Sequence, residues 1–239
     1  MRRIKHQKYD GSYLHFNNVE WPGGLGDAMF VMNYIYYRQG PFFIHNHNNN
    51  YFRHYPGLID YYPESMSKVQ NMPVPGDLAH EITCCRFTNW LYENKKPIVQ
   101  IYPKTKIEKD PNEFKVVIAQ REKKGTNADD LMKYVPAEAT QVVNVANKRD
   151  AGIDWLVNEI ASADLYIGSC TGPTWVAASL RIPSKMVAWE STDMKFVNNV
   201  RNWFDIQENC EWIKIGQRQG KGGNKEDCEA DRKVFKPVP

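Results

Sequence analysis

Short apolar runs alternate with amphipathic stretches through residues 111–239, whereas residues 1–110 show weaker periodicity. An apolar run of four to seven residues indicates a buried strand, and apolar positions three and four apart indicate a helix. Strands alternating with helices predict a parallel sheet with helices on both faces. The expected strands are 115–120, 140–146, 164–169 and 184–190, and the expected helices are 127–136, 152–163 and 172–182.

The first part of the chain predicts fewer regular elements. We expect strands at 12–20, 42–45 and 96–103, an apolar helix at 28–38, and a helical or strand–helix segment at 80–96. Residues 46–80 predict an irregular region with short helices. The charged stretch 104–114 predicts a domain junction, so we divide the chain into 1–110 and 111–239, and we interpret the polar, glycine-rich 216–239 as a loop and tail.

A glycine turn, "WPGGLGDAMF", precedes the apolar helix. Gly23, Gly24 and Gly26 suit a tight turn or a close approach of backbone to a ligand. Asp27 stands at the predicted helix start, where a carboxylate can cap free N–H groups. Spacing alone leaves both interpretations open, a structural corner and a binding site.

A second small-residue loop, 168–172, lies between a predicted strand and a predicted helix. Ligands collect at the carboxyl ends of parallel strands, and a helix N-terminus there suits a phosphate. We expect Ser169, Cys170, Thr171, Gly172 and Pro173 to line such a site. The alternative is an ordinary strand–helix connection. Glu190 ends the last predicted strand and is a candidate for a ribose hydroxyl, or equally for a helix cap.

Composition narrows the class of protein. The 239 residues are 42% hydrophobic and 13% aromatic, which suits a globular core, and the net charge of +3 is too small to indicate a polyanionic partner. No apolar run approaches the roughly 20 residues that span a bilayer. Five cysteines without a disulfide-framework spacing favour a reducing, cytoplasmic setting.

The stretch "ADLYIGSCTGPTWVAASLRIP", residues 163–183, resembles the "ADLxIGxDSGPxHxAAALxxP" pattern of the bacterial heptosyltransferases. These are glycosyltransferases of the B-type fold, and they also carry a Gly-Asp pair before an apolar helix, as Gly26 and Asp27 do here. The resemblance implies two Rossmann-like α/β domains facing across a cleft. The acceptor-side domain, 1–110, would be trimmed, and 111–239 would bind a nucleotide sugar, with the tail packing back on the first domain.

The resemblance also implies roles. Asp27 would be the general base that accepts the proton of an acceptor hydroxyl, and the three glycines would let the substrate approach. Arg121, with Lys123 nearby, would stabilise the leaving nucleoside diphosphate together with the 168–172 loop. Since the sequence has no Asp-x-Asp pair, we expect no essential metal. We also expect no cofactor beyond the nucleoside-diphosphate sugar that serves as donor, and no membrane span.

Two departures and three alternatives accompany this interpretation. The aspartate of the family's loop is Cys170 here, and its histidine is Trp175. "GGLGDAMF" is also similar to the "GGLGNQxF" opening of fucosyltransferases, although their "HxRRxD" motif is absent. The same chemistry on a hydroxylated base in DNA is a second alternative, in which aromatic residues stack on the base. A nucleotide-binding module without catalysis is the third.

Overall fold

The computed structural model describes residues 24–38, 42–45, 57–72, 84–120, 126–146, 151–190 and 195–217. Its centre is a parallel sheet of five strands in the order β4-β3-β5-β6-β7. The strands are β3 (Lys115–Ala119), β4 (Gln141–Asn144), β5 (Leu165–Gly168), β6 (Ser184–Glu190) and β7 (Cys210–Gln217). The prediction of an α/β chain with a parallel sheet is therefore confirmed.

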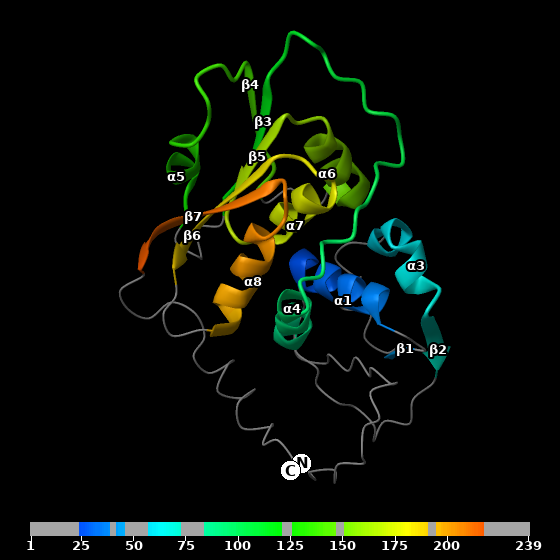
Figure 1. Ribbon diagram of the computed structural model, residues 1–239. Helices are drawn as coiled ribbons and strands as arrows, with labels where there is room; N and C mark the ends of the chain where they lie inside the picture. The colour runs from blue at the N-terminus through cyan, green and yellow to red at the C-terminus, as the bar shows by residue number, and fades with distance from the viewer. Residues whose placement is uncertain are drawn as a thin grey trace.

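The helices between these strands cover the two faces unequally (Figure 1). Val116, Ile118 and Ile167 pack with Leu131 of α5 (Ala128–Met132) on one face. Val117, Tyr166 and Met186, whose side chains alternate with these, lie in the larger core on the other face. That core includes α6 (Gly152–Ala161), α7 (Gly172–Ser179) and α8 (Lys195–Asp205).

The first part of the chain packs on the second. Helix α1 (Leu25–Tyr37) lies against α7, and α4 (Cys84–Glu93) lies against α8. Buried residues from both parts, including Met32, Leu91, Trp175 and Trp203, belong to one core cluster. The remaining elements are β1 (Phe42–His45), the 3₁₀ helix η2 (Leu58–Tyr61), α3 (Pro63–Met66) and β2 (Val69–Met72), with β1 and β2 forming a parallel pair. The proposed boundary between 110 and 111, and a cleft beside it, stay predictions.

The expected strand at 96–103 is wrong. This segment joins no sheet. Its backbone is bonded by side chains instead: Ile98 N–H donates to Gln207 Oε1 at 2.9 Å and Val99 N–H to Asn33 Oδ1 at 2.7 Å. Arg181 Nη2 donates to the Ile98 carbonyl. Because partners from three helical regions meet the backbone groups, no neighbouring strand is needed.

Helix α8 and strands β2 and β7 are elements that the sequence pattern did not predict. Other expected elements in the described ranges are present with shifted ends; α1, for example, begins at Leu25 rather than Ala28. The expected strand at 12–20 and most of the tail 216–239 lie outside the described residues. The sequence analysis overlooked α8, although its apolar residues Val200, Trp203 and Phe204 lie three and four positions apart.

Candidate functional site

The strand order places a switch point between β3 and β5. The chain passes from β3 to β4 on one side of β3 and then crosses to β5 on its other side. With β3 counted as the first strand, this is the doubly wound order 2-1-3-4-5. In such sheets ligands bind outside the carboxyl ends at the switch point. Here those ends are Ala119 and Gly168, which are register partners. The 169–172 loop therefore begins at the place where the topology favours a ligand.

Buried hydrogen bonds fix this loop. Ser169 N–H donates to the Ala119 carbonyl at 3.0 Å, which extends the β3–β5 pairing by one residue. Thr174 Oγ1 donates to the Ser169 carbonyl at 2.5 Å and lies 3.1 Å from the Tyr166 hydroxyl. Tyr166 is fully buried, and burial raises the pKa of its phenol far above the usual value. The neutral Tyr166 and Thr174 thus hold the loop in one conformation.

The first turns of α1 and α7 meet. A Cβ added at Gly26 would lie 3.7 Å from Gly172 Cα and 3.0 Å from Trp175 Cδ1. A Cβ added at Gly172 would lie 2.5 Å from Leu25 Cβ. The two glycine motifs, nearly 150 residues apart in sequence, therefore form one corner. Both helices begin there, so two N-terminal ends with partial positive charge adjoin.

Asp27 caps its own helix. Its Oδ2 accepts the Gly24 N–H at 2.8 Å, and Asp27 N–H in turn donates to the Gly24 carbonyl at 3.0 Å. The side chain stays partly exposed. A carboxylate that is both anchored by one hydrogen bond and reachable by solvent can still accept a proton through its other oxygen. The geometry is thus compatible with both interpretations of the glycine turn, as a structural corner and as a binding site.

Arg201, which the sequence analysis missed, lies at the same edge of the sheet. It is only 9% exposed, and its guanidinium donates from Nη1 to the carbonyl of Trp189, near the carboxyl end of β6. The guanidinium also lies 5.3 Å from the centre of the Trp212 ring and reaches the Cys170 side chain. Burial lowers the pKa of Arg201, and the nearby Cys170 and Glu190 oppose that shift. An unrecognised α8 hid this cation from the sequence analysis.

Glu190 ends β6 beside a second cation. Its Oε1 lies 3.8 Å from Lys214 Nζ, and both side chains are about half exposed. Lys214 Nζ lies 4.8 Å from the centre of the same Trp212 ring that Arg201 covers. Arg201 of α8 and Lys214 of β7 thus both contact the Trp212 ring, and Lys214 also lies near Glu190 at the end of β6.

The structure separates the predicted loop residues by exposure. Ser169 is 1% exposed, and its Oγ points at the Ala119 carbonyl, so its side chain is part of the core. Cys170, Thr171, Gly172 and Pro173 are partly exposed. Gly23, Arg121 and Lys123 lie outside the described residues. Their contacts with a substrate stay predictions.

Trp175 stands where the resembled family has histidine, and it is a core residue. Its ring is 2% exposed and stacks on Trp203 at 5.4 Å, with Phe30 and Phe204 packed edge-on at 4.7 and 5.7 Å. These four rings come from α1, α7 and α8. The departure from the family pattern therefore joins the two parts of the chain and leaves no imidazole at this position.

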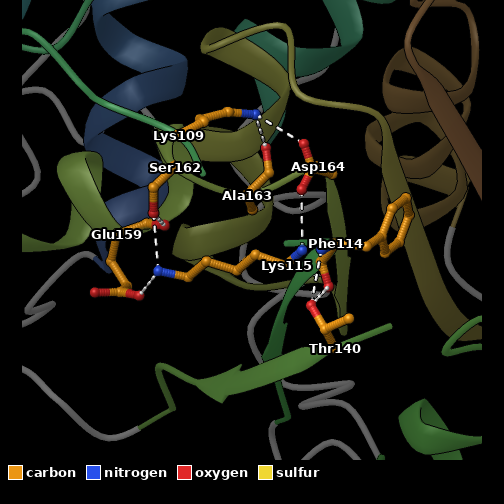
Figure 2. Close-up of polar contacts among 8 residues, drawn as sticks. All are labelled: Lys109, Phe114, Lys115, Thr140, Glu159, Ser162, Ala163 and Asp164. Carbon is orange, nitrogen blue, oxygen red and sulfur yellow. Dashed lines mark hydrogen bonds and ion pairs between the residues drawn. The ribbon is translucent and has the colours of Figure 1, made fainter. Parts of the chain in front are cut away.

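The amino ends of β3 and β5, opposite the candidate site, carry a connected polar network (Figure 2). Asp164 accepts the Lys115 N–H at 2.9 Å and the Lys109 ammonium at 3.2 Å, while Lys115 Nζ pairs with Glu159. These groups lie at the amino ends of β3 and β5 and at the end of α6. They satisfy strand and helix ends and fasten the 104–114 segment to the sheet. We therefore assign this edge to stability.

Two absences apply to the described part of the chain. Across its seven ranges, no three His, Cys, Asp or Glu side chains gather as metal ligands would. Within the same ranges, the helices are too short or too polar to cross a membrane.

No protein-family model and no curated protein sequence matches this chain. The bacterial iron-containing dodecameric glycosyltransferase TibC from enterotoxigenic E. coli H10407 has a similar structure, with 13% identity and a TM-score of 0.45 over 89% of this chain and 63% of that chain. A second structure, the dodecameric iron-containing heptosyltransferase TibC with ADP-D-beta-D-heptose, gives 13% identity and a TM-score of 0.43 over 89% and 62%. This chain thus spans less than two thirds of either relative.

Proposed function

We propose that this protein is a glycosyltransferase that moves a sugar from a nucleoside-diphosphate sugar to an acceptor hydroxyl. One observation carries the proposal: the starts of α1 and α7 meet at Gly26 and Gly172, beside the switch point of the sheet. This corner offers a helix N-terminus to the diphosphate and a carboxylate, Asp27, to the acceptor. The resemblance of 163–183 to the heptosyltransferase pattern supports the assignment of the diphosphate to the start of α7.

In the proposed reaction the acceptor oxygen attacks the anomeric carbon of the sugar. A bond forms between that carbon and the acceptor oxygen, and the bond from the carbon to the diphosphate oxygen breaks. The acceptor proton passes to the Asp27 carboxylate, and the electron pair leaves with the nucleoside diphosphate. The backbone N–H groups at the start of α7 stabilise the negative charge that develops on the leaving group.

The partly exposed loop residues have different roles in this proposal. Thr171, the N-cap of α7, donates its hydroxyl to the Ser169 carbonyl at 3.2 Å, so its backbone and not its hydroxyl faces a phosphate. Pro173 has no N–H and contributes only its fixed φ to the first turn. Gly172 brings its backbone within reach. Glu190 is the candidate for a ribose hydroxyl, since it ends the next strand.

The test is a panel of nucleoside mono- and diphosphates, with UDP, GDP, ADP and CMP included, measured by thermal shift. A nucleotide at about a hundredfold over its Kd should stabilise the protein by roughly 2.7 kcal/mol. A crystal structure with the best binder should place the phosphates against the start of α7. Phosphates bound near Asp164 at the amino ends of β3 and β5, or no binding by any nucleotide, would overturn the proposal. Turnover is then measured as nucleoside diphosphate released from matching sugar nucleotides.

A further inference from the structure

Arg201 is a buried cation whose hydrogen bonding is incomplete. Its Nε is buried and has no hydrogen-bond partner among the described residues. Across the same residues Arg201 forms no ion pair, and the nearby Glu190 carboxylate pairs with Lys214. A buried charge without a counter-ion is costly, and a buried donor without an acceptor adds to that cost. The protein keeps this arginine at a place where an anion would relieve both costs.

The surroundings of Arg201 show where that anion would lie. The guanidinium reaches Cys170, which directly precedes Thr171, the N-cap of α7. On its other side it is fixed by the Trp189 carbonyl and by the Trp212 ring. A phosphate at the start of α7 would therefore lie next to a planar fork of donors that is already oriented. Such preorganised contacts are the strong ones, since little rotamer entropy is lost on binding.

We propose that Arg201 binds a phosphate of the diphosphate at the start of α7, between the carboxyl ends of β5 and β6. This proposal rests on the function proposed above and adds to it the residue that neutralises the leaving group. The arginine acts through its charge and its donor fork, and it touches the ligand without exchanging a proton.

The test compares Arg201→Gln, Arg201→Lys and the control Lys214→Gln in the full chain. Lys214 lies over the same Trp212 ring but is half exposed and paired with Glu190. The probes are inorganic pyrophosphate and the nucleoside diphosphates, titrated by calorimetry. Arg201→Gln should raise the Kd for pyrophosphate about 10- to 100-fold, the usual worth of charged hydrogen bonds. Arg201→Lys should lie between, and Lys214→Gln should change the Kd less than about fivefold.

The two probes separate this proposal from the function above. Nucleoside diphosphates that bind wild type and Arg201→Gln equally well overturn the role of Arg201 and leave the glycosyltransferase proposal standing. If pyrophosphate binds through Arg201 but the wild type binds no nucleotide, the glycosyltransferase proposal is overturned and the anion-binding role of Arg201 stands. A wild type that binds neither probe overturns both.

A purely structural Arg201 would behave differently. Arg201→Gln would then lower Tm and leave the pyrophosphate Kd of the folded protein unchanged. If the Arg201 variants do not fold, a crystal structure of the wild type with pyrophosphate decides the matter. A phosphate oxygen within hydrogen-bond distance of the guanidinium supports the proposal, and pyrophosphate bound elsewhere overturns it.

Discussion

Gly172 at the start of α7 lies directly against Leu25 at the start of α1: a Cβ on Gly172 would stand 2.5 Å from the Leu25 Cβ. The sequence analysis assigned Gly172 to ligand binding, but this contact shows that the residue also sets the distance between two helices. Any side chain here must push α1 away from α7. The two parts of the chain would then lose contact at the proposed site.

We therefore predict that Gly172→Ala lowers the free energy of unfolding by about 1–3 kcal/mol, the usual cost of overpacking. Urea denaturation measures the change. Gly24→Ala is the matched control, since a Cβ there would meet nothing closer than 3.6 Å. It should change stability by less than about 1 kcal/mol. Equal losses in both variants would mean that the tight contact at Leu25 is unimportant.

Trp175 supports the second prediction. Replacing this buried ring by the histidine of the resembled family removes its stacking on Trp203 and buries a polar imidazole. We expect Trp175→His to destabilise the protein by about 2–5 kcal/mol, measured by urea denaturation. Trp90→His, at a partly exposed ring that packs edge-on with Tyr34 at 5.2 Å, should cost clearly less. A stable Trp175→His protein would show that the aromatic cluster tolerates the family residue.

Asp164 predicts a dependence of stability on pH. The Lys115 N–H and then the Lys109 ammonium lower the pKa of Asp164 below its usual value. A carboxyl with a lowered folded-state pKa stabilises the fold above the unfolded pKa of about 3.9, and this stabilisation is lost as pH falls through the folded pKa.

Asp164→Asn should accordingly lower the free energy of unfolding near pH 7 and lose its difference from wild type as the pH falls through the lowered folded-state pKa of Asp164. Denaturation at a series of pH values measures this. Glu108→Gln, at an exposed carboxylate of the same segment, is the control and should follow the wild-type profile. A constant gap between Asp164→Asn and wild type at all pH values would assign the effect to packing and not to the charge.

The sequence predicted the parallel sheet because its strands are apolar runs separated by helices of clear period, such as α6 with Ile153, Leu156 and Ile160. It also placed the 169–172 loop at a carboxyl edge, which the structure confirms. It could not predict which side chains of that loop are buried. Ser169 and Cys170 are adjacent small residues, and only the hydrogen bond from Ser169 to Ala119 distinguishes them.

The sequence analysis missed Arg201 and wrongly predicted a strand at 96–103, because both depend on tertiary contacts. The backbone of Ile98 is bonded by Gln207, and the Arg201 guanidinium by the Trp189 carbonyl. Period and composition report only local structure. The contact of Gly26 with Gly172 is of the same kind: each glycine motif was recognised, but their meeting required the tertiary structure.

The proposed reaction predicts that divalent metals are dispensable. The start of α7 and the cation Arg201 would supply the positive charge that a metal gives the diphosphate in other transferases. We expect turnover to be unchanged within about twofold after treatment with a chelator and to show no further gain with Mg²⁺ or Mn²⁺. Loss of turnover with chelator and its recovery with either ion would assign the leaving group to a metal.

The last prediction separates the two roles of Asp27. Asparagine keeps the oxygen that accepts the Gly24 N–H, so the free energy of unfolding of Asp27→Asn should lie within about 0.5 kcal/mol of the wild-type value. Asp27→Ala should lower the free energy of unfolding by about 0.5–2 kcal/mol. Since asparagine cannot take a proton, Asp27→Asn should lower turnover about 10²–10⁴-fold, the worth of a positioned general base. Nucleoside diphosphate binding should stay within about threefold, because the diphosphate is assigned to α7. Steady-state kinetics and calorimetry on the same preparation measure both quantities. An Asp27→Asn protein with normal turnover would leave Asp27 as a helix cap and require another base.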